Sequence, residues 1–183
     1  MDKLLLENLI HLSINNNSDA FRRIVEDYQS MVYSLAFKIL NNEQDAKDIV
    51  QETFIKVWLH LKKYNPDKKF TNWLYTITTN LCLDKLRSLK HLSSNENIEN
   101  DMINLISSDN AEQKMIDKEF GNIVFSLTNM LTPKQKIVFT LHCLEGLEIK
   151  EIIEITSMTS AKIKSNLFLA RKKIQEKLSQ YEK

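Results

Sequence analysis

Apolar residues recur at every third or fourth position along most of the chain, which is the period of an amphipathic helix. The Asn41-Asn42 pair and the turn of residues 64–67 interrupt this pattern. The expected helices of the N-terminal half therefore cover residues 3–12, 18–40, 43–63 and 70–90. Their apolar faces are wide enough to close one hydrophobic core.

The helical period is lost between residues 91 and 111, where Ser, Asn, Asp and Glu dominate. Residues 91–113 contain five acidic residues and no lysine or arginine. A segment of this composition has too little apolar surface to fold by itself, and it predicts a flexible acidic linker over residues 91–111. We therefore expect two small helical domains, over residues 1–90 and 112–183.

The C-terminal half carries a pattern typical of a helix-turn-helix. Thr132-Pro133-Lys134-Gln135 predicts a helix start, with a capping threonine, a proline at the first position and a glutamine at the third. Gly146 predicts the end of this helix, because glycine takes the left-handed conformation without strain. A short segment over residues 148–155 follows, and a last helix opens at Thr159-Ser160. The second helix of such a motif can lie in the DNA major groove.

Composition favours an all-α fold, because 183 residues include only two glycines and two prolines, too few turn residues for a β-rich chain. The net charge of +1 indicates no class of partner, but the distribution of charge does. Residues 162–177 carry six basic residues against one acidic residue, as expected of a helix that contacts DNA phosphates.

The last helix combines short polar groups suited to base edges with cations suited to phosphates. The same side chains could instead form only a solvated basic face. The candidate residues for duplex DNA are Thr159, Lys162, Lys164, Ser165, Asn166, Arg171, Lys172 and Lys173.

A second cluster of cations and aromatic residues lies in the middle of the chain. Such a mixture suits single-stranded nucleic acid, whose unstacked bases can lie on aromatic rings. Trp73 is read as a core residue, whereas Tyr64 in the turn is freer to stack. Asn80 is either a groove-facing contact or a satisfied core amide. The candidate residues are Lys62, Lys63, Tyr64, Lys69, Asn80, Lys85 and Arg87.

No group of residues predicts catalysis or metal binding. The four histidines lack metal-ligand spacing, and Cys82 and Cys143 have no nearby cysteine partner. We therefore expect no enzyme activity, no cofactor and no metal. The chain shows no signal peptide and no apolar run of membrane length, which predicts a cytoplasmic protein without membrane insertion.

Four segments resemble the sigma-70 family of bacterial RNA polymerase, in its extracytoplasmic-function (ECF) subgroup. The segment from Asp45 to Trp58 (DAKDIVQETFIKVW) is similar to region 2.2 of that family. The segment from Phe70 to Ile77 (FTNWLYTI), with Asn80, Asp84 and Arg87 after it, is similar to regions 2.3 and 2.4. Residues 131–146 and 147–178 resemble regions 4.1 and 4.2.

The resemblance implies a sigma factor that directs core RNA polymerase to promoters. Asp45, Asp48, Gln51 and Glu52 would bind the coiled-coil clamp of the largest polymerase subunit, whereas without the resemblance they would be read as a solvated helix start favoured by the helix dipole. The mid-chain cluster would meet the −10 promoter element, and the last helix would read the −35 element. The acidic linker would thread through polymerase channels, and an anti-sigma protein is an expected partner.

The sequence also departs from the family pattern. Glu148 stands where the family usually has a capping serine or threonine, and Ser157 stands where the turn usually has glycine. Ile153 replaces the small residue that the family usually has where the two helices cross. Asn166 and Leu169 stand where arginines are common. Two rival hypotheses remain: a free-standing, dimeric helix-turn-helix regulator, and a sigma-like helical adaptor without promoter recognition.

Overall fold

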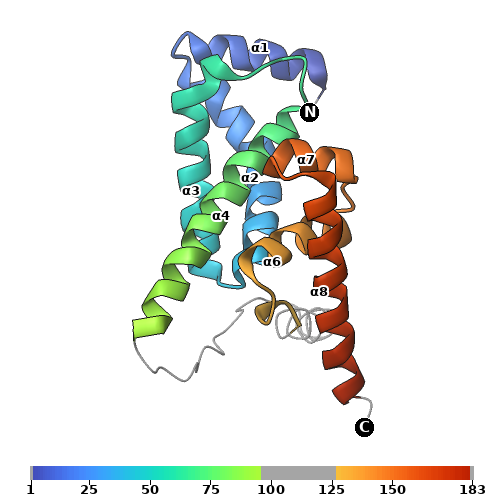
Figure 1. Cartoon of the computed structure of the whole chain (residues 1–183). Coiled ribbons are helices and arrows are strands. Elements are labelled where there is room, and N and C mark those ends of the chain that lie inside the picture. Colours follow the sequence, from blue (N-terminus) through green and yellow to red (C-terminus); the bar gives the residue numbers. More distant parts are fainter. Residues whose placement is uncertain (1, 96–126, 182–183) are drawn as a thin grey trace, which may run out of the picture.

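A computed structural model describes residues 2–95 and 127–181. Within these ranges the regular structure is helical, as Figure 1 shows, which confirms the expected all-α fold. The elements are α1 (Lys3–Ile14), α2 (Ser18–Leu40), α3 (Glu43–His60), η1 (Leu61–Lys63), α4 (Phe70–Asn95), α6 (Pro133–Phe139), η2 (Thr140–Leu144), α7 (Ile149–Thr156) and α8 (Ser160–Tyr181). The expected acidic linker lies almost entirely outside the described residues.

The N-terminal unit, α1–α4, closes a core between its four helices and η1. Asn17 caps α2, because its side-chain oxygen accepts from the amide of Ala20 at 3.0 Å. Asn41 ends α2 in the left-handed conformation, and Asn42 then caps α3. Two consecutive asparagines therefore set the tight corner that folds α3 back on α2.

The C-terminal unit, α6–α8, begins with the expected capping box between Thr132 and Gln135. α6 continues into a π-helical turn, η2, and the chain leaves it at Gly146 with φ of +70°. α7 and α8 follow as predicted, with the turn between them at Ser157. The helix-turn-helix is thus present in the form the sequence indicated.

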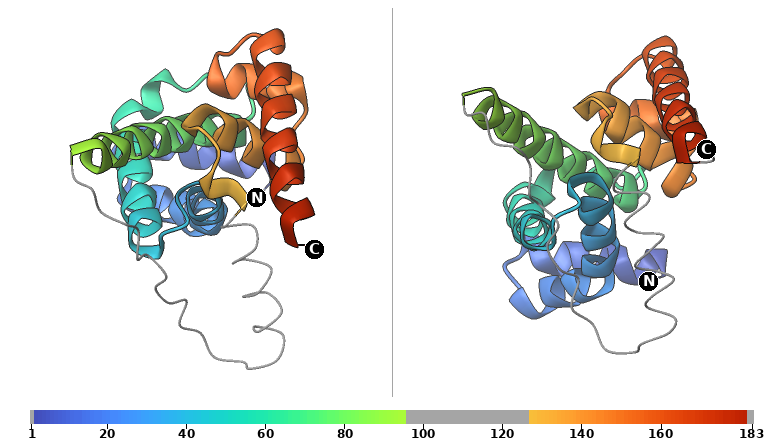
Figure 2. Two further views of the ribbon diagram at one scale, coloured as in Figure 1. Left: turned by 60° about the horizontal axis from the view of Figure 1, so that its bottom comes forward. Right: turned by 90° about the horizontal axis from the view of Figure 1, so that it is seen from below.

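The two units pack against each other. α7 lies across the first half of α4, and α6 lies beside α4, as Figures 1 and 2 show. One buried cluster contains Leu35 and Cys82 from the N-terminal unit together with Ile137, Ile152 and Ile163 from the C-terminal unit. The sequence predicted two units but did not predict whether they are in contact. In the structure they share one buried apolar cluster.

No helix in residues 2–95 or 127–181 has the length and apolar character needed to cross a membrane. The same ranges hold no group of three or more His, Cys, Asp or Glu side chains placed to bind a metal ion.

Candidate nucleic-acid interface

α3 presents an exposed polar face on the side away from α2 and α4. Asp48, Gln51 and Glu52 are exposed on successive turns of this helix. The Gln44 side-chain amide donates to Asp48 Oδ1 at 3.2 Å, and Lys56 Nζ lies 3.4 Å from Glu52 Oε1. Pairs at this spacing on an exposed helix face contribute little to stability, so these groups remain available to a partner.

Two apolar residues extend this face and were missed by the sequence reasoning. Ile55 is 58% exposed and Leu59 is 67% exposed, one turn apart and in line with Asp48 and Glu52. Both lie in a stretch where apolar residues cover more than one face of the helix, so the sequence alone could not distinguish them from core positions. Exposed aliphatic side chains beside carboxylates are typical of a protein-binding surface.

Asp45 differs from its three predicted companions because it is half-buried and paired with a residue of another helix. Lys85 Nζ of α4 lies 2.7 Å from Asp45 Oδ1. This contact joins a residue expected to bind polymerase to one expected to bind the −10 element. Each side chain therefore has a structural role that the sequence pattern did not reveal.

The turn before α4 places several predicted −10 residues on the surface. Lys62, Lys63 and Lys69 are exposed there, and Asn80 is exposed on α4. Exposure of Asn80 excludes the alternative of a satisfied core amide. Arg87 is also exposed, with Nη1 3.4 Å from Asp84 Oδ1.

Tyr64 is not the free ring that its position in a turn suggested. It is half-buried, with its ring centroid 5.2 Å from that of Phe70 and 5.3 Å from that of Trp73. Its hydroxyl donates to the carbonyl of Lys68 at 2.6 Å. The aromatic cluster fixes the turn, because edge-on ring contacts favour one arrangement.

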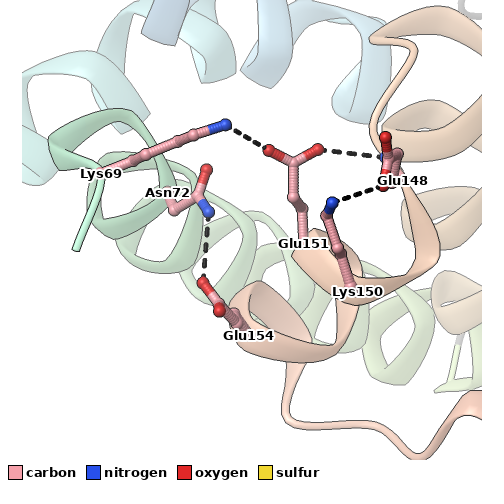
Figure 3. A network of polar contacts seen from close by, with 6 residues as sticks. All are labelled: Lys69, Asn72, Glu148, Lys150, Glu151 and Glu154. Carbon is pink, nitrogen blue, oxygen red and sulfur yellow. Dashed lines mark hydrogen bonds and ion pairs between the residues drawn. The ribbon is translucent and has the colours of Figure 1, made fainter.

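Asn72 is a further polar group of α4 that the sequence reasoning passed over. It is only 8% exposed, and its side-chain amide donates to Glu154 Oε2 of α7 at 3.3 Å. Figure 3 shows this contact beside the one between Lys69 and Glu151. A polar residue within an apolar stretch is the feature that could have identified Asn72. Its partner could not be identified in the same way, because Glu154 lies 82 residues away in the sequence.

On α8, the predicted −35 residues are divided between different surroundings. Thr159, Lys162, Lys164, Ser165, Arg171 and Lys172 are exposed. Lys173 is half-buried, and its ammonium group lies 3.3 Å from Gln135 Oε1 and 3.5 Å from the carbonyl of Met130. Lys173 therefore ties α8 to the capping box of α6. The Asn166 amide is also engaged, because it donates to the carbonyl of Lys162 at 2.7 Å.

A cavity of about 600 Å³ lies along α8, beside several of these exposed cations. Lys164, Arg171 and Lys172 line it together with Phe168, which is 68% exposed, and with His142 of η2. Phe168 was not among the predicted contacts, because the sequence reasoning counted only polar residues. An exposed aromatic ring beside three cations suits a groove that meets both bases and phosphates.

The departures from the family pattern have clear structural counterparts. Ser157 adopts φ of +55°, the conformation that glycine takes without strain. Ile153 is 36% exposed, so its side chain is not enclosed at a crossing between helices. Glu148 occupies the cap position of α7, where its backbone amide donates to Glu151 Oε2 at 3.1 Å.

Lys136 of α6 is a buried cation at the contact between the two units. It is 4% exposed, and its ammonium group donates to Asn129 Oδ1 at 3.3 Å. Burial lowers the pKa of Lys136 to about 8. Cys82 of α4 faces it, and burial raises the pKa of that thiol to about 12. The contact between the two units thus holds a lysine whose ammonium group loses its proton near pH 8.

Comparison with known proteins agrees with this arrangement of helices. The family model described as Sigma-70 region 2 matches residues 24–91, and that described as Sigma-70, region 4 matches residues 122–174. The chain is 30% identical over 185 residues to the ECF RNA polymerase sigma-E factor of Escherichia coli, covering 97% of this chain and 94% of the relative. It is 26% identical to the ECF RNA polymerase sigma factor SigW of Bacillus subtilis, with 96% and 98% covered.

Two solved structures share the fold. CnrH, in complex with the cytosolic domain of CnrY, aligns with a TM-score of 0.68 at 20% identity, over 98% of this chain and 97% of that chain. The sigma factor RpoE of Bartonella quintana, in complex with the anti-sigma factor NepR, aligns with a TM-score of 0.66 at 20% identity, over 87% and 96%. A two-unit helical protein with a region 2 and a region 4 is a sigma-70-type factor. The chain belongs to the ECF RNA polymerase sigma factors of the sigma-70 family.

Proposed function

We propose that this sigma factor binds core RNA polymerase through the exposed face of α3, formed by Asp48, Gln51, Glu52, Ile55 and Leu59. The observation that carries the proposal is the line of exposed carboxylate, amide and aliphatic groups on one side of a single helix. Aliphatic anchors surrounded by polar groups are the usual composition of the centre of a protein interface. Asp45 supports this face by holding Lys85 of α4.

We assign promoter contacts to two separate surfaces. Lys62, Lys63, Lys69, Asn80 and Arg87 would meet the opened −10 strand, with Tyr64 and Lys85 supporting the turn and α4 beneath them. The exposed groups at the start of α8 and around its cavity would meet the −35 duplex. Neither surface needs high affinity alone, because binding to polymerase raises the effective concentration of both at the promoter.

The remaining assignments follow from this role. The factor itself would carry out no chemistry, since RNA synthesis belongs to the polymerase, and it would act in the cytoplasm. The domain boundaries of residues 1–90 and 112–183 are proposed with one adjustment, because α4 continues to Asn95. An anti-sigma partner is proposed because a structure of similar fold, RpoE of Bartonella quintana, is a complex with the anti-sigma factor NepR.

Run-off transcription tests the proposal. The full chain is mixed with core polymerase and a template carrying the region upstream of its own coding sequence. The proposal predicts a discrete transcript that requires the chain. Polymerase binding without a transcript would favour the adaptor hypothesis, and DNA binding as a homodimer without polymerase binding would favour the free-standing regulator.

A further inference from the structure

We propose that Leu169 of α8 makes this factor select a T·A base pair in the −35 element, through contact with the C5-methyl group of thymine. This role depends on the proposed contact of α8 with the −35 duplex, and it names the base that one position of that helix prefers. The cations of α8 would supply affinity for phosphates, which carry no sequence information, whereas Leu169 would supply specificity.

Leu169 lies on the same side of α8 as two of the predicted base contacts. Lys162, Asn166 and Leu169 follow one another at intervals of four and three residues, so their side chains form one stripe along the helix, which we term the groove stripe. Ile163 and Leu167 are buried in the core on another side of α8. The second helix of a helix-turn-helix places exposed side chains against base edges in the major groove. Because the Leu169 side chain is 42% exposed, it is accessible for that contact.

The polar neighbours of Leu169 discriminate poorly between bases. The Asn166 amide is held by the carbonyl of Lys162, to which it donates at 2.7 Å. The ammonium group of Lys173, one turn after Leu169, lies 3.3 Å from a side-chain oxygen of α6. Ser165, one turn before Leu169, is exposed, but a hydroxyl can bond to the donors or the acceptors of any base. The choice of base at this point of the groove stripe therefore depends on the leucine.

Thymine is the base whose major-groove edge suits an isobutyl group best. Its C5 methyl is apolar, whereas guanine presents two acceptors, and cytosine and adenine each present an amino donor. A leucine packed over one of those polar edges keeps water away without replacing its hydrogen bonds, which costs free energy. Contact with the thymine methyl instead removes apolar surface from water. Burial of one methyl-sized group should favour thymine about fourfold.

Exposure of a leucine does not by itself indicate a function, because single apolar residues are common on protein surfaces. Leu178 of the same helix is 41% exposed, almost as much as Leu169. The two residues are nine positions apart, which is about two and a half helical turns, so Leu178 points to the opposite side of α8. The position of Leu169 on the groove stripe is therefore what distinguishes it, and Leu178 provides a matched control.

Promoter selection by holoenzyme, assembled from core polymerase and the full chain, tests this role. The template library carries the region upstream of the chain's own coding sequence, with its −35 segment randomised. We expect the native chain to select a T·A pair at a position where Leu169→Ala shows no preference. Leu169→Met should keep the preference, because methionine is also apolar. Leu169→Arg should move it to G·C, because a guanidinium group can donate to both acceptors of guanine.

Deoxyuridine in place of thymine isolates the contribution of the methyl group, because it removes only the C5 substituent. At the selected position this replacement should weaken promoter binding by the native holoenzyme about fourfold and leave binding by Leu169→Ala unchanged. Leu178→Ala should behave as the native chain does. Phe168→Ala should also remain sensitive to deoxyuridine, which separates Leu169 from the exposed ring next to it in the sequence.

The outcomes distinguish the role of Leu169 from the proposed function. Equal sensitivity of the native chain and Leu169→Ala to deoxyuridine, with −35 sequence preference otherwise intact, would overturn the role of Leu169 and leave α8 as the reader of the −35 duplex. Loss of the sensitivity in Phe168→Ala but not in Leu169→Ala would assign the methyl contact to Phe168 instead. Transcription that is indifferent to the whole randomised segment would overturn the −35 assignment of α8, and the thymine contact with it.

Discussion

Lys85 Nζ of α4 lies 2.7 Å from Asp45 Oδ1 in the first turn of α3. The two side chains are 38% and 19% exposed, so water screens the pair only in part. The ion pair therefore fixes the angle between the helix proposed to bind polymerase and the helix proposed to meet the −10 strand.

Replacing Lys85 with Met should lower the free energy of unfolding by about 1 kcal/mol, because it leaves the half-buried Asp45 carboxylate without its partner. Urea denaturation measures this change. Arg87→Met is a matched control, since Arg87 pairs with Asp84 on the exposed side of the same helix. Equal stability of the two variants would show that the Asp45 pair has no structural role.

The buried Lys136 predicts a stability that rises with pH. Its pKa is about 8 in the folded protein and 10.5 in the unfolded chain, so between these values the unfolded chain binds more protons. Stability is then lowest below pH 8 and rises by about 1 kcal/mol from pH 8 to pH 9. The raised pKa of Cys82 opposes this rise from about pH 8, because the unfolded thiol, with a pKa of 9.0, is half ionised at pH 9, and it removes about a third of the Lys136 effect over this range.

Chemical denaturation at pH 7, 8 and 9 checks the prediction. Lys136→Met should abolish the rise, because methionine fills a similar volume without a titrating group. A rise of the same size in Lys136→Met would assign the effect to another group.

Two positions in the left-handed conformation should respond in opposite directions. Ser157→Gly should raise stability by about 1 kcal/mol, since a side chain at φ of +55° is strained. Gly146→Ala should lower it by about 1 kcal/mol, although no atom lies within 4 Å of the added Cβ. Thermal melts of both variants test this, and changes of the same sign would contradict the conformational explanation.

The cations of α8 should divide into two classes. Lys164→Ala should weaken −35 recognition by polymerase holoenzyme by about 1–3 kcal/mol and leave stability unchanged. Lys173→Ala should instead lower stability, because its ammonium group ties α8 to Gln135 and Met130. Asn166→Ala should follow Lys164→Ala if its amide turns to the bases on binding. Promoter binding and urea denaturation, measured on all three, distinguish these roles.

Local signals explain why most helices could be predicted. Thr132, Pro133 and Gln135 act within one helical turn, so neighbouring residues determine the start of α6. The paired asparagines at 41 and 42 mark a corner for the same reason. Helix ends were less certain: α4 runs to Asn95, past the apolar pattern, since propensity alone carries a helix for a turn or more.

Contacts between distant residues could not be predicted. Lys69 and Glu151 are 82 residues apart, and each looks like an ordinary surface charge in its own helix. Tyr75 and Glu145, whose side chains also meet, are 70 residues apart. Exposure was also hidden, because Ile55, Leu59 and Phe168 fit a helical apolar period but lie on the surface. Periodicity finds a helix, and only tertiary packing decides which side of a broad apolar stripe is covered.

The most direct test of the account is the affinity of core RNA polymerase for the full chain and for Gln51→Ala/Glu52→Ala. The control Glu26→Ala/Gln29→Ala changes the same residue types at exposed positions of α2. We predict that the α3 variant binds polymerase at least about tenfold more weakly, with unchanged helix content, and that the control binds as the native chain does. Equal affinity of all three proteins would contradict the proposal that α3 is the polymerase-binding surface.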